Sequence, residues 1–177
     1  DMLGHSMGGN LAIYISNKTP NILNKIVIVD IVPKKYKNMH QDILSGLKSI
    51  DFNLIGSRRE ADDKLSSYIS DERVRHFLLK NLYWKSEHKL GFRFNLDVLY
   101  DYSKNSITNK FENPISFKGP ALFLHGKSSN YVNEQDYELI NYHYSNASII
   151  KVPNSGHWLH ADNPDFFLEK TINFLNS

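Results

Sequence analysis

Three short, strongly apolar runs constrain the fold of this chain more than any other feature. They are "KIVIVDIVP" at 25–33, "PALFLHG" at 120–126 and "ASIIKVP" at 147–153. Nearly continuous runs of this kind, rich in β-branched residues, indicate strands that are buried on both faces, as in parallel sheets. Helical patterns follow or separate them, at 9–20, 133–144 and 164–176. The alternation predicts an α/β fold built on a parallel sheet.

A long insertion, residues 34–110, interrupts this alternation. Segments such as "MHQDILSGLKSI" and "DERVRHFLLKNLYW" have helical spacing, and we find no strong strand pattern there. We therefore expect a core formed by 1–33 and 111–177, with a helical cap formed by 34–110. Basic residues outnumber acidic ones in the insertion. That excess indicates either a solvated helical face or a cationic lid over an anionic ligand.

The composition excludes several functions. A net charge of +2 over 177 residues argues against a dedicated nucleic-acid binder. The chain has no cysteine, so disulfides, thiolate catalysis and cysteine-based metal sites are excluded. No apolar run approaches the roughly 20 residues that span a bilayer. The chain starts at Asp1 without a methionine. We therefore expect a piece of a longer protein that is cytoplasmic, or organellar if the upstream part carries a targeting peptide.

The stretch "DMLGHSMGGN" contains a G-x-S-x-G motif centred on Ser6. A motif of this kind is meaningful when a strand precedes it and a helix follows, because the serine then sits on a sharp, strained turn. "DML" hints at the strand, the pattern at 9–20 supplies the helix, and Gly4 and Gly8 provide small flanking residues. We expect Ser6 to be a nucleophile and the backbone N–H of Met7 to be an oxyanion donor. The alternative is a glycine-rich turn that carries a solvent-exposed serine.

A nucleophilic serine needs a base within hydrogen-bonding reach. His157 follows the third strand run on a loop before the last helix, where it can reach the carboxyl edge of a sheet. His160 is the main competitor and is expected to pack at the helix start or to face solvent. We expect His5 to pack beside the nucleophile and His125 to pack at the end of its strand. The remaining histidines lie in helical or polar stretches, and they are His40, His76, His88 and His143.

Three segments together resemble the carboxyl-terminal two-thirds of an α/β-hydrolase: "LGHSMGG", "HGKSSNYV" and "GHWLHADNPDFF". "VDIVP" and "FLLKNL" are similar to YbfF-type bacterial esterases and their mitochondrial relatives. The resemblance covers essentially the whole chain and implies an N-terminally truncated serine hydrolase. It implies carboxylic esters or thioesters of short to medium acyl chains as substrates, with acyl-CoA among the candidates. It implies no cofactor and no metal.

The acid of the triad stands at an unusual position. Most α/β-hydrolases carry it in a pattern like hG-x-x-D-x-x-V, but here that slot holds Ser129, which cannot be negatively charged at pH 7. Asp30 ends a buried strand run, where an unpaired charge would be costly, and His157 is a suitable partner. The YbfF-type resemblance implies the same arrangement, with Asp30 as the acid and Ser129 in an auxiliary role. Glu134 and Asp136 remain as reserve acids.

The sequence defines the substrate pocket and the second oxyanion donor less well than it defines the catalytic residues. Candidate residues for an acyl pocket are His5, Phe77, Leu78, Leu82, Tyr83, Trp84, Phe92 and Phe94. We expect most of those in the cap to form its own core instead. In this fold the second oxyanion donor belongs to a loop that precedes the serine. We therefore expect the isolated 177-residue chain to be inactive.

Other functions remain open at this stage. Ser6 excludes haloalkane dehalogenases and epoxide hydrolases, whose nucleophile is aspartate. Carbon–carbon hydrolases, cofactor-free haloperoxidases and aminopeptidases share the serine triad. A non-catalytic binding module with the hydrolase fold is the alternative outside enzymes. The expected partner is a small-molecule ester or thioester, and the sequence indicates no oligomeric state.

Overall fold

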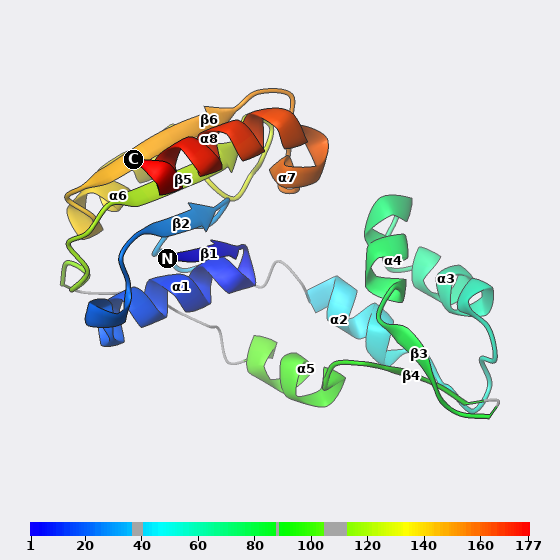
Figure 1. Ribbon diagram of the computed structural model, residues 1–177. Helices are drawn as coiled ribbons and strands as arrows, with labels where there is room; N and C mark the ends of the chain where they lie inside the picture. The colour runs from blue at the N-terminus through cyan, green and yellow to red at the C-terminus, as the bar shows by residue number, and fades with distance from the viewer. Residues whose placement is uncertain (37–40, 88, 105–112) are drawn as a thin grey trace. The chain divides into compact units, whose positions relative to one another are not determined.

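The structure, a computed structural model, describes residues 1–36, 41–87, 89–104 and 113–177. It divides into two compact units, which are described separately (Figure 1). The first unit comprises Asp1–Lys34 and Asn109–Ser177, and the second comprises Lys35–Thr108. The predicted core–cap boundary at 110 and 111 lies outside the described residues, as do His40 and His88. No helix within the described ranges is long and apolar enough to cross a membrane.

A four-stranded parallel sheet forms the centre of the first unit. Its strands are β1 (Met2–His5), β2 (Ile26–Val29), β5 (Ala121–Gly126) and β6 (Ala147–Val152), in the order β1-β2-β5-β6. The three strands that the apolar runs predict are present as β2, β5 and β6. The segment "DML" leads into the fourth strand, β1, which begins at Met2. β2 and β5 are buried at every residue, as expected for strands covered on both faces. These observations confirm the predicted α/β class.

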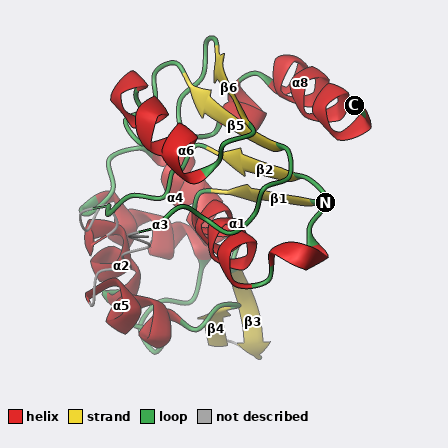
Figure 2. Cartoon of the chain, turned by 90° about the vertical axis from the view of Figure 1, so that its left-hand side faces the viewer, coloured by secondary structure: helices red, strands yellow, loops and turns green. Residues whose placement is uncertain are grey.

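Helices cover the two faces of this sheet (Figure 2). On one face, α8 (Pro164–Asn176) packs Phe166 and Phe174 against a cluster that includes Val27 and Leu122. On the other face, Phe123 contacts Tyr144, whose hydroxyl bonds to Ser16 of α1 (Met7–Lys18) at 2.8 Å. Successive side chains of a strand point to opposite faces, so neighbouring residues of β5 contribute to both layers.

Two 3₁₀ turns and two short helices also belong to the described part of the first unit. They are the 3₁₀ turns η1 (Pro20–Ile22) and η2 (Glu134–Asp136), and the helices α6 (Tyr137–His143) and α7 (Leu159–Asp162). The helix predicted over 133–144 is therefore a 3₁₀ turn followed by α6. Asn133 and Asp136 form a capping box at its start, which tightens the first turn.

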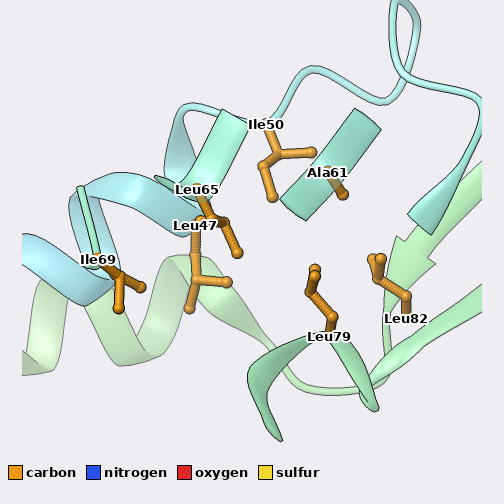
Figure 3. Close-up of a cluster of buried hydrophobic side chains, with 7 residues drawn as sticks. All are labelled: Leu47, Ile50, Ala61, Leu65, Ile69, Leu79 and Leu82. Atoms are coloured by element: carbon orange, nitrogen blue, oxygen red, sulfur yellow. The ribbon is translucent and has the colours of Figure 1, made fainter. Parts of the chain in front are cut away.

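The second unit has a small apolar core of its own (Figure 3). Its helices in the described ranges are α2 (Gln41–Lys48), α3 (Arg58–Ser66), α4 (Glu72–Leu79) and α5 (Leu96–Lys104). The buried side chains at its centre are Leu47, Ile50, Ala61, Leu65, Ile69, Leu79 and Leu82. Asp71 caps α4 by accepting a hydrogen bond from the backbone N–H of Arg73. Burial of one side of each short helix stabilises this unit far more than helix propensity does.

Besides its helices, the insertion contains a pair of strands that the sequence pattern did not predict. β3 (Leu82–Ser86) and β4 (Lys89–Phe92) form an antiparallel pair, and the helix predicted over 71–84 ends at Leu79. Few residues of the pair are buried, and an irregularity between Trp84 and Ser86 interrupts the period of two that marks a strand. A pattern this short is not distinguishable from the end of an amphipathic helix.

Candidate active site

Ser6 lies on the turn that joins β1 to α1. Its backbone has φ 54° and ψ −117°, a strained conformation for a residue with a side chain. The turn is fixed from both sides, because the Ser6 N–H donates to the carbonyl of Val29 at 3.0 Å and the Ser6 carbonyl accepts from Asn10 N–H at 3.0 Å. Strain held by surrounding structure is the property expected of a nucleophile elbow.

The glycines around Ser6 differ in how much space there is for a side chain. A Cβ on Gly4 would lie 2.3 Å from the carbonyl oxygen of Gly8, and one on Gly9 would lie 2.4 Å from Cγ2 of Ile31. A Cβ on Gly8 would meet nothing within 4 Å. The close approach of β1 to α1 thus depends on Gly4 and Gly9. The expectation that Gly8 is required as a small flank is wrong on steric grounds.

Asp30 lies directly after β2 and its carboxylate is completely buried. Like Ser6, it has a positive φ of 53°. Its Oδ1 accepts the backbone N–H of Gly126 at 3.1 Å, and its Oδ2 accepts the hydroxyl of Ser129. His157 Nδ1 lies 2.7 Å from the same Oδ2. A buried carboxylate is costly unless hydrogen-bonded, and this one accepts two hydrogen bonds from the segment at the end of β5 and faces the imidazole of the loop after β6.

His157 lies on the loop between β6 and α7, with 23% of its side chain exposed. That loop turns through Asn154, which has a φ of 53°, and Gly156 N–H donates to Asp162 Oδ2 at 2.9 Å. The backbone carbonyl of His157 is 2.8 Å from Nε2 of His5, the residue that precedes the strained serine. Because Nδ1 faces Asp30, Nε2 remains as the atom that can exchange a proton.

The other histidines of the first unit make contacts that differ from those of His157. His160 is exposed on α7, with its ring 4.9 Å from the ring of His5. His5 packs beside His157 at 4.7 Å between ring centroids, and burial lowers its pKa. His125 is buried at the end of β5, where its Nε2 is 2.7 Å from the hydroxyl of Tyr137. Desolvation is also the main cause that lowers the pKa of His125.

The reserve acids have cationic partners of their own. Asp136 binds the Lys34 ammonium at 2.7 and 2.8 Å and accepts the backbone N–H of Asn133. Glu134 is paired with Lys151, which lowers the pKa of that carboxyl. Both carboxylates are thus explained by helix capping and ion pairing. The structure brings Asp30 to His157 instead.

Most candidate pocket residues belong to the second unit. Phe77 and Trp84 are exposed, Leu78 packs against the apolar core of that unit, and the Arg93 guanidinium lies 5.1 Å from the Tyr83 ring centroid. Their part in an acyl pocket stays a prediction.

A hollow of about 650 Å³ opens within the second unit, and its lining includes Phe92 and Phe94 together with Phe52. Leu82, another candidate, is a buried member of the core.

Sequence reasoning missed one aromatic residue at this site. Tyr131 stacks on His157 with ring centroids 3.8 Å apart and an interplanar angle of 15°. Its backbone N–H donates to Ser129 Oγ at 3.2 Å. The segment "HGKSSNYV" contains this tyrosine, but no periodicity distinguishes it from an ordinary loop residue. Only the fold shows that the loop after β5 passes over the histidine.

Among the described residues, no group of three or more histidine, aspartate or glutamate side chains has the arrangement of a metal site. The polar network instead consists of a carboxylate, a hydroxyl and an imidazole. This set of groups suits proton transfer and nucleophilic catalysis.

Comparison with known proteins agrees with the fold. No protein-family model matches the chain. The chain is 34% identical to the sn-1-specific diacylglycerol lipase ABHD11 of Danio rerio, over 98% of this chain and 56% of the relative. It is 29% identical to Esterase YbfF of Escherichia coli, over 98% of this chain and 66% of the relative. It thus spans between about half and two-thirds of the length of these relatives.

A solved structure gives the same result. The structure described as a marine microorganism esterase superposes with a TM-score of 0.86 at 34% identity, over 97% of this chain and 68% of that chain. The chain therefore belongs to the α/β-hydrolase family, which has YbfF-like members. The family resemblance read from the motifs is confirmed.

Proposed function

We propose that this chain carries the nucleophile, base and acid of a serine hydrolase that cleaves carboxylic esters. Ser6 is the nucleophile, His157 the general base and Asp30 the acid that orients the base. The observation that carries the proposal is the 2.7 Å contact between His157 Nδ1 and the buried Asp30 carboxylate. Burying the charge of Asp30 is energetically costly. A buried carboxylate in contact with the histidine is expected where it must stabilise an imidazolium.

The chemical steps follow from these positions. His157 keeps a proton on Nδ1 for Asp30, so its Nε2 accepts the Ser6 hydroxyl proton as Oγ attacks the ester carbonyl. Collapse of the tetrahedral intermediate transfers that proton to the leaving alcohol and leaves an acyl group on Ser6. Water, deprotonated by the same Nε2, then attacks the acyl-enzyme, the bond to Ser6 Oγ breaks to release the acid, and the proton on Nε2 returns to Ser6 Oγ. Ser129 supports Asp30 by donating its hydroxyl to Oδ2.

The oxyanion is stabilised at the start of α1. The backbone N–H of Met7 belongs to the first turn of a 12-residue helix that has no acidic residue in that turn, so the field there favours negative charge. In this family a loop that precedes the elbow supplies the second donor. The isolated 177-residue chain is therefore expected to hydrolyse esters poorly, whereas the full-length protein is expected to be active.

The substrate class is narrowed by the relatives and by charge. Relatives are described as a diacylglycerol lipase and as esterases, which favours acyl esters. Thioesters use the same acyl-enzyme, and the excess of basic residues in the second unit suits the phosphates of an acyl-CoA. We expect short to medium acyl chains.

The test compares p-nitrophenyl butyrate, a longer p-nitrophenyl ester and an acyl-CoA as substrates of the full-length protein. Wild type should hydrolyse the short ester, and Ser6→Ala should lose that activity. The 177-residue chain serves in parallel to test the need for the second oxyanion donor. Equal turnover by wild type and Ser6→Ala would rule out the proposed nucleophile.

A further inference from the structure

Tyr131 makes the closest ring contact of His157 within the described residues. The two rings are nearly parallel, at 15°, with their centroids 3.8 Å apart. The ring of His5, which also contacts this imidazole, is tilted by 41° with its centroid 4.7 Å away. A face-to-face contact as close as the first restrains the plane of the imidazole. The plane in turn determines the direction in which Nε2 points.

The tyrosine is held by the same hydrogen-bond network as the acid. Its backbone N–H donates to Ser129 Oγ, which donates to Asp30 Oδ2, the oxygen that faces His157. The next residue, Val132, is buried and anchors the segment in the core. Backbone and core contacts thus help to place the ring over His157.

The electrostatics of the contact favour a cation. The face of an aromatic ring carries partial negative charge and attracts a positive group stacked on it. Burial, aided by the charge of Asp30, raises the pKa of Tyr131, so the phenol stays neutral where an esterase works. Two groups with negative or partly negative charge thus face the His157 imidazole: the Asp30 carboxylate at Nδ1 and the Tyr131 ring at its face.

We propose that Tyr131 is a positioning residue for His157, one that fixes the imidazole plane and stabilises the imidazolium formed when the serine is deprotonated. This inference rests on the proposed function. The aromatic face, and not the hydroxyl, is the part that acts. A phenylalanine at this position should therefore keep the function of the tyrosine. A leucine, which fills a similar volume without a π-face, should lose it.

The kinetic test uses the full-length protein with Tyr131→Phe and Tyr131→Leu. Tyr131→Leu is expected to lower kcat roughly 2- to 30-fold, the range of a cation–π contact, with little change in KM. Tyr131→Phe should keep the wild-type kcat. Tyr137→Leu is the matched control, because that tyrosine contacts His125 instead. Equal kcat values for the leucine and phenylalanine variants at position 131 would overturn the proposal.

A second measurement separates this inference from the proposed function. In a ¹H–¹³C spectrum of histidine-labelled protein, assigned with His157→Gln, the stacked ring should shift the His157 ring protons upfield. Tyr131→Phe should keep that shift and Tyr131→Leu should lose it. An unchanged His157 signal in Tyr131→Leu would contradict the stacking itself. If the shift is lost but the wild type hydrolyses no ester, the contact stands and the proposed function fails.

Discussion

Replacing Asp30 by asparagine tests the assignment of the acid, because the change keeps size and removes only charge. Asp30 accepts from Gly126 N–H at Oδ1 and from Ser129 and His157 at Oδ2. An amide can offer one carbonyl oxygen and one NH₂ group. The NH₂ group cannot face Gly126 N–H, since two donors would meet. It must therefore take the Oδ2 position, opposite His157 Nδ1.

That orientation reverses the role of the histidine. Nδ1 must then accept a hydrogen bond from the amide, so the neutral imidazole carries its hydrogen on Nε2, which can no longer deprotonate Ser6. The same change in a serine protease triad lowers kcat by about 10⁴-fold with the geometry intact. We expect a loss of roughly 10³- to 10⁴-fold in kcat for Asp30→Asn, with KM little changed.

The assay is ester hydrolysis by the full-length protein, with Asp136→Asn as the matched control. Asp136 is a buried aspartate of the same unit, but its carboxylate pairs with Lys34. That control should keep kcat within a few-fold of wild type while losing some stability. The assignment is refuted if Asp30→Asn retains activity within about 10-fold of wild type, or if both variants lose activity equally.

Two further predictions concern stability. Gly4→Ala should lower the unfolding free energy by about 2–3 kcal/mol or more, because its Cβ meets backbone atoms. Gly8→Ala should be neutral or slightly stabilising. Equal urea midpoints for the two variants would contradict this prediction. Burial lowers the pKa values of His5, His125 and His143 below the 6.5 of an exposed histidine. The unfolding free energy should therefore be level above about pH 6.5 and fall on acidification; stability that rises between pH 7 and pH 5 would contradict this.

Much of the first unit was predictable because its signals are local. The strands β2, β5 and β6 are short apolar runs, and α8 begins at Pro164, directly after Asn163. The position of Asp30 after a buried strand predicted a partner for its charge. The observed contact with His157 follows from parallel strands that end at one edge of the sheet.

The unpredicted features depend on tertiary packing. The β3–β4 pair is too short and irregular to differ from a helix end in sequence. Tyr131 acquires its contact only when the loop after β5 meets the loop after β6, and loop sequence carries no periodic signal for such an encounter. Similarly, the difference between Gly4 and Gly8 arises from the distance between β1 and α1.

The measurement that tests the central claim most directly is active-site labelling of the full-length protein with a fluorophosphonate. Mass spectrometry of the digested adduct should place the phosphonate on Ser6, the residue with the strained backbone after β1. Labelling should disappear in Ser6→Ala and be strongly slowed in His157→Gln. A folded protein that remains unlabelled, or an adduct that persists at another residue in Ser6→Ala, would contradict the account.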